Sequence, residues 1–156
     1  MARRNRAPKR KVAPDSRYNS VPVQKFINRM MIGGKKSTAT RIMYEALDSA
    51  EARANRPAVE IFNDAMQNVM PPVEVKPRRV GGATYQIPVE VEHHRQVSLA
   101  IRWLLAAARG RPGRGMSEKL AAELLDAANS AGSAVRRREE TLRMAEANRA
   151  FAHLRW

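Results

Sequence analysis

The chain has 156 residues, which is enough for one compact domain with a substantial hydrophobic core. Its 29 Lys and Arg residues against 15 Asp and Glu give a formal net charge of +14, which favours a polyanionic partner such as a nucleic acid. The absence of cysteine excludes disulfides and thiolate chemistry, and the longest apolar run, residues 103–108, is too short to span a membrane.

Residues 1–14 form a basic arm that we expect to be disordered until it meets a polyanion, because the segment has too few apolar residues to order itself by burial. No apolar segment follows it, so we expect an intracellular protein without a secretory signal. Residues 6–12 also resemble a nuclear-import signal, although such runs are common in RNA-binding tails. The arm's candidate contacts are Arg3, Arg4, Lys9, Arg10 and Lys11.

Three amphipathic helices are predicted before the first change of pattern. Their apolar stripes cover residues 23–31, 39–54 and 59–70. Gly33-Gly34 should stop the first helix, and Ser37 should cap the second. Asn55 is the predicted cap of the third helix, with Pro57 in its first turn.

Residues 73–91 show alternating apolar and polar positions, which predicts a β-hairpin. Gly81 and Gly82 can supply the positive φ angles of a tight turn. An isolated two-stranded ribbon is marginally stable, so we expect it to project from a helical body. The end of the ribbon carries Lys76, Arg78 and Arg79, which indicates an arm that contacts phosphate.

A fourth helix carries Arg95, Arg102 and Arg109 at intervals of seven residues. This spacing places them in one stripe, about 10 Å apart. Most charge stripes are simply solvated faces, but no acidic residue is interspersed here, and we therefore interpret the stripe as a phosphate contact. The following loop, residues 109–115, combines arginine with glycine, which lets the backbone approach a ligand closely.

Two further helices follow, the last beginning near Ser133, and residues 149–156 form a C-terminal tail with docking aromatics. The predicted fold class is therefore mainly α. We expect a bundle of about six helices, with a protruding two-stranded β-hairpin after the third helix. Residues 15–156 should form this single domain.

No catalytic, cofactor or metal site is predicted. The segment 34–38 resembles a phosphate-binding loop, but a second lysine separates the glycine from the Ser/Thr pair. Lys35 and Lys36 are better interpreted as polyanion contacts at a helix start. His93 and His94 are adjacent and point in different directions on a helix, so they cannot chelate one metal ion together.

Several segments together resemble the small-subunit ribosomal protein seven family in its bacterial form. They are Tyr18-Asn-Ser, Lys25-Phe-Ile-Asn, Gly34-Lys-Lys-Ser-Thr, Arg41-Ile, Met70-Pro-Pro-Val-Glu-Val-Lys-Pro-Arg-Arg-Val-Gly-Gly, Arg114-Gly-Met-Ser-Glu-Lys-Leu-Ala and Met144-Ala-Glu-Ala-Asn-Arg-Ala-Phe-Ala-His. The matches run in order from near residue 15 to the end of the chain, which makes the resemblance far more specific than any single motif.

The resemblance implies a cytoplasmic, ribosome-bound structural protein that binds the 3′ domain of small-subunit rRNA and nucleates assembly of the subunit head. It implies a position near the decoding region, with the hairpin close to exit-site tRNA and to mRNA. Neighbouring head and platform proteins would be partners, whereas no membrane, cofactor or small-molecule substrate is expected.

The resemblance also implies residue roles. The hairpin role falls on Lys76, Arg78, Arg79, Gly81 and Gly82. The rRNA-binding role falls on the basic arm and on Lys25, Arg29, Lys35, Lys36, Arg95, Arg102, Arg109, Arg111, Arg114 and Met116. Without the resemblance, the alternative is an architectural DNA-binding protein that inserts the ribbon into the minor groove.

Overall fold

The computed structural model describes residues 11–154 and is mainly helical. The elements are α1 (Val21–Met30), α2 (Lys36–Ala54), α3 (Ala58–Val69), β1 (Val73–Val80), β2 (Ala83–Glu90), α4 (His93–Gly110), α5 (Met116–Ala128), α6 (Gly132–Ala147) and the 3-10 helix η1 (Arg149–Leu154). Six α-helices in the described range, with a hairpin after the third, confirm the predicted fold class. No described helix has both the length and the apolar character that a membrane span requires.

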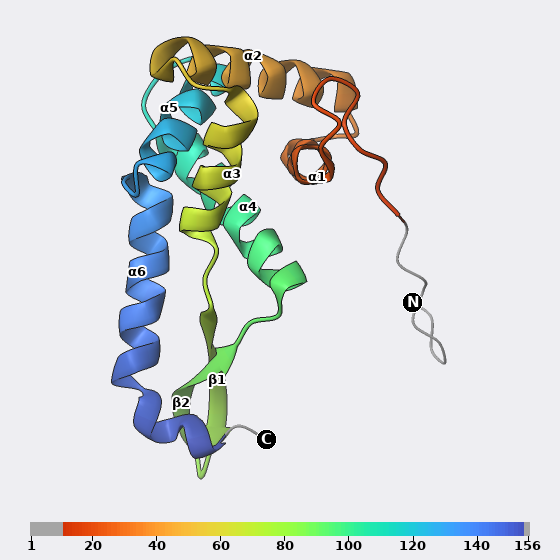
Figure 1. Cartoon of the computed structure of the whole chain (residues 1–156). Coiled ribbons are helices and arrows are strands. Elements are labelled where there is room, and N and C mark those ends of the chain that lie inside the picture. Colours follow the sequence, from red (N-terminus) through yellow and green to blue (C-terminus); the bar gives the residue numbers. More distant parts are fainter. Residues whose placement is uncertain (1–10, 155–156) are drawn as a thin grey trace.

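The core lies where the helices converge around α5, which packs against α2, α3, α4 and α6 (Figure 1). Leu120 and Leu124 of α5 are fully buried there. Helix α1 joins the same core through Phe26, whose ring meets that of Phe62 edge-on at a centroid distance of 5.7 Å. The apolar stripes expected from the helical period are therefore the faces that the bundle buries.

The helix ends differ from the expected caps. Helix α2 begins at Lys36, so Ser37 lies inside its first turn and makes no capping hydrogen bond. Asn55 ends α2 with a φ of +52°, a left-handed conformation that asparagine tolerates. Pro57 therefore stands just before α3. Helix α1 ends at Met30, and Gly33-Gly34 belongs to the turn into α2.

The hairpin is antiparallel, and its register brings Val80 opposite Ala83. The two intervening residues, Gly81 and Gly82, have φ angles of +59° and +88°, as the sequence predicts. The ribbon projects from the helical body, but α6 runs beside β1 and η1 crosses β2 (Figure 1). In the contact between η1 and β2, the ring centroids of Phe151 and Tyr85 lie 5.0 Å apart. The C-terminal segment therefore supports a hairpin that would be marginally stable alone.

Candidate nucleic-acid interface

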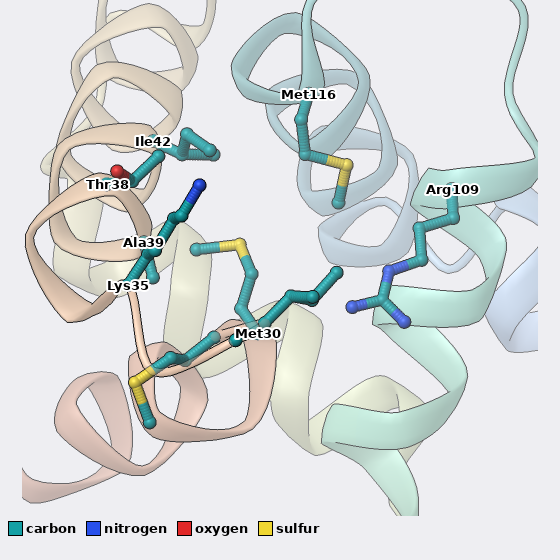
Figure 2. A pocket seen from close by; sticks show the side chains of 10 residues that line it. Met30, Lys35, Thr38, Ala39, Ile42, Arg109 and Met116 are labelled. Carbon is teal, nitrogen blue, oxygen red and sulfur yellow. The ribbon is translucent and has the colours of Figure 1, made fainter.

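Three of the predicted RNA contacts meet at a cavity of about 590 Å³ between the α1–α2 turn, α4 and α5. Lys35 and Arg109 lie on opposite sides of it, with Met30 and Met116 between them (Figure 2). The walls are largely apolar, and Ile32 at the mouth is 72% exposed. Cationic side chains from two elements therefore flank an apolar hollow, an arrangement that can hold a backbone phosphate and a base at once.

A second hollow joins α1 to α4. Lys25 and Arg29 of α1 line it together with His94 and Ser98 of α4. Lys25 and Arg29 are four residues apart and lie on one side of their helix. The structure therefore brings the predicted contacts of α1 next to the helix that carries the arginine stripe.

A third hollow lies where the chain enters the body, and Lys11 and Lys36 line it. Met31 borders both this hollow and the cavity between Lys35 and Arg109, and Asn28 borders both this hollow and the one between α1 and α4. The three hollows are thus parts of one surface around α1. We call it the basic face, and its cations are Lys11, Lys25, Arg29, Lys35, Lys36 and Arg109.

No cation of the basic face forms an ion pair within residues 11–154. These six cations therefore have no direct acidic partner in the described part of the protein, and Asp15 is the acidic residue that lines the third hollow with them. Arg3, Arg4, Lys9 and Arg10 of the predicted arm lie outside the described residues. Lys11 is exposed and places the described start of the chain at the edge of this face.

The arginine stripe of α4 divides into two kinds of residue. Arg102 and Arg109 are exposed, and neither forms an ion pair with a described acid. Arg95 instead binds Glu74 of β1, with Nη2 2.7 Å from Oε2 and Nε 2.9 Å from both carboxylate oxygens. The sequence pattern misses this partner because Glu74 is distant from Arg95 along the chain.

Glu74 is only 8% exposed, and it also forms an ion pair with Lys76, whose Nζ lies 3.1 Å from Oε1. Burial raises the pKa of this carboxyl, but the hydrogen bonds from Arg95 and Lys76 outweigh burial and hold the pKa below its ordinary value. Lys76 is therefore partly neutralised. Arg78 and Arg79 are exposed cations of the hairpin without a described acidic partner. Because consecutive strand residues point to opposite faces, these two side chains lie on opposite faces of the ribbon.

The glycine-arginine loop is likewise divided. Arg114 is exposed, whereas Arg111 reaches back to α5 and forms ion pairs with Glu123 and Asp126. Burial lowers the pKa of Arg111, but the two carboxylates raise it by more than burial lowers it. The pKa is therefore above its ordinary value, and the guanidinium stays charged. Arg111 thus has protein partners that sequence spacing does not indicate.

Asp15 is a residue that the sequence analysis did not single out. Its carboxylate is 3% exposed and accepts hydrogen bonds from the Tyr44 hydroxyl at 2.5 Å and from the amide of Tyr18 at 2.9 Å. Burial raises the pKa of Asp15, but these bonds bring it below the ordinary value. The carboxylate also accepts a hydrogen bond from the amide of Arg17, two residues on, at 3.1 Å, which is the bond of an Asx turn. The contact anchors the chain to α2 directly behind the basic arm.

The described residues hold no group of three His or acidic side chains that could bind a metal ion. His93 and His94 are exposed at the start of α4, and Nδ1 of His94 lies 3.0 Å from Oε2 of Glu92.

Known proteins resemble this chain over nearly its whole length. A family model described as Ribosomal protein S7p/S5e matches residues 2–149. The chain is 58% identical over 156 residues, covering all of both chains, to small ribosomal subunit protein uS7 of Methylorubrum populi. It is also 58% identical over 153 residues, or 98% of each chain, to the protein of that name from Chloroflexus aurantiacus. For Rhodospirillum centenum the identity is 56% over the full length of both chains. The basic face and the hairpin lie inside all of these matches.

Proposed function

Because this chain belongs to the ribosomal protein S7p/S5e family, we propose that it binds the 3′ domain of small-subunit rRNA through the basic face. The relatives are small-subunit ribosomal proteins, so the chain is a ribosomal protein of the small subunit and not an enzyme. Within that role it nucleates assembly of the subunit head and acts in the bacterial cytoplasm.

The observation that carries the rRNA proposal is the continuous group of cations around α1 that form no ion pair with a described acid. Cations from the chain entry, α1, the α1–α2 turn and α4 border connected hollows. A surface of this kind releases condensed counterions when it binds phosphates, which gives affinity without sequence readout. The apolar walls of the cavity between Lys35 and Arg109 add a place for unpaired bases. Contacts with unpaired bases let proteins recognise folded RNA beyond its backbone.

The hairpin has a separate proposed role. Its exposed cations Arg78 and Arg79 lie next to the Gly81-Gly82 turn of a supported ribbon. Figure 1 shows this turn at the end of the molecule opposite α2. We place this end near exit-site tRNA and mRNA in the decoding region, with neighbouring head and platform proteins as further partners. The family resemblance and the uncompensated charge of the ribbon support this placement.

The test is binding of the full chain to a transcript of the 3′ domain of small-subunit rRNA at several salt concentrations. Excess tRNA and duplex DNA serve as competitors. Tight binding that survives both competitors is expected. Binding that either competitor abolishes contradicts the proposal, and a preference for bent duplex DNA would support the architectural DNA-binding alternative instead.

A further inference from the structure

Arg111 stands at the junction of three helices. It follows the last residue of α4, and its Nε donates to Oε2 of Glu123 at 2.6 Å while its Nη2 donates to Asp126. Glu123 has no exposed surface, and the Arg111 side chain is 25% exposed. The guanidinium is therefore directed into the protein, between the end of α4 and the middle of α5.

The same carboxylate holds the start of α6. Oε1 of Glu123 accepts a hydrogen bond from the amide of Ala134 at 3.0 Å. Helix α6 has no side-chain cap of its own, so this buried acid from α5 satisfies one of its free amides. A carboxylate at a helix N-terminus is also favoured by the helix dipole.

Gly132 shows how closely the junction is packed. Its φ is +88°, and a Cβ at this position would lie 3.0 Å from Oε1 of Glu123 and 3.1 Å from Cβ of Asp126. A side chain there would displace the carboxylate that Arg111 binds. The chain from Arg111 through Glu123 to Ala134 thus links α4, α5 and α6 at one point, which we call the clamp.

We propose that Arg111 is a positioning residue for RNA binding and not a phosphate ligand. The clamp fixes the start of the loop 111–115, and so holds Arg109 before it and Arg114 within it in place for RNA. Both flanking arginines are exposed and have no described acidic partner, whereas Nε of Arg111 is bound to Glu123 and its Nη2 to Asp126. This inference rests on the proposed function, because RNA binding is its readout.

The discriminating variant is Glu123→Gln, since a fully buried side chain cannot touch RNA. If the clamp positions the loop, E123Q and R111A both weaken binding to the 3′-domain transcript by roughly tenfold, the cost of ordering arginine side chains on binding. Both lower the affinity equally at every salt concentration, and the double variant costs no more than either single one. R114A, which removes a direct contact, instead lowers the salt slope by roughly 0.7–0.9.

A phosphate-ligand role for Arg111 predicts the opposite. R111A would then lower the salt slope as R114A does, and E123Q, by releasing Arg111, would leave the affinity unchanged or increase it. Either result overturns the proposal. If E123Q fails to fold, D126N and G132A replace it, because both disturb the clamp. G110A is the matched control, since Gly110 has open space around it and no positive φ.

Hydrogen exchange at the Ala134 amide separates failure of this inference from failure of the proposed function. The clamp predicts faster exchange at Ala134 in R111A and E123Q than in the wild type and G110A, whether or not RNA is present. Unchanged exchange in R111A overturns the clamp. If tRNA or duplex DNA displaces the 3′-domain transcript from the wild-type protein, that result contradicts only the RNA-binding proposal.

Discussion

The guanidinium of Arg95 on α4 forms an ion pair with the carboxylate of Glu74 on β1, with Nη2 2.7 Å from Oε2. The pair joins the first turn of α4 to the base of the hairpin. Because Glu74 is 11% exposed at its side chain and Arg95 is 46% exposed, the acid is the member that depends on the pair for its charge. The pair therefore connects the ribbon to the helix that carries the arginine stripe.

Glu74→Gln should destabilise the fold by about 1 kcal/mol at neutral pH, because the ion pair with Arg95 is lost. The folded-state pKa of Glu74 lies below its ordinary value of 4.5, so its contribution is present above that value. It is lost as the pH falls through the folded-state pKa. Thermal unfolding from pH 7 to pH 3 should show the wild type converging on E74Q. Glu90→Gln, at an exposed strand position, should show no such convergence.

Arg102→Ala and Arg109→Ala should each lower the salt slope of rRNA binding by roughly 0.7–0.9, as expected for one lost phosphate contact. Arg95→Ala should leave the slope unchanged, because Arg95 is bound to Glu74. Titrations of the 3′-domain transcript at four or more salt concentrations measure these slopes. Arg53→Ala, in the last turn of α2, is the matched control. If R102A and R53A show the same salt slope of rRNA binding, Arg102 belongs to a solvated face and makes no phosphate contact.

Gly81→Val should destabilise the hairpin by about 1–2 kcal/mol, the cost of a left-handed conformation in a residue with a Cβ. No atom lies within 4 Å of the Cβ position, so the cost is one of backbone conformation and not of space. Gly81→Asn should be nearly neutral, since Asn-Gly suits a two-residue hairpin turn. Hydrogen exchange of the strand amides and thermal unfolding measure both effects. Equal losses in the two variants would contradict this account of the turn.

Tyr44→Phe should destabilise the protein by about 1–3 kcal/mol, because it leaves the buried Asp15 carboxylate without its hydroxyl partner. The pKa of Asp15 should rise as that bond is lost. Trypsin should then cleave after Arg17 faster than in the wild type. Tyr18→Phe removes only a 3.4 Å contact with Asp48 and is the control. Identical cleavage rates in the two variants would contradict an anchoring role for Asp15.

Local sequence patterns were sufficient for the elements of this protein. The helical period marked the apolar stripes of the first three helices, and alternation with Gly81-Gly82 marked the hairpin and its turn. These signals are local because a helix or a two-residue turn is fixed by neighbours in the chain. Helix ends were less predictable: Asn55 can cap a following helix or end a preceding one, and packing selected the second.

The sequence by itself determined the family, the fold class and the excess of positive charge. Only the tertiary structure decided which cations remain free to meet RNA. Arg95 and Arg111 look like Arg102 and Arg109 in the sequence, but folding brings buried acids on other elements against them. It also collects the lysines of separate segments around α1 into the basic face. Ion pairing depends on distance in space, and residues far apart in the chain acquire that distance only when the core packs.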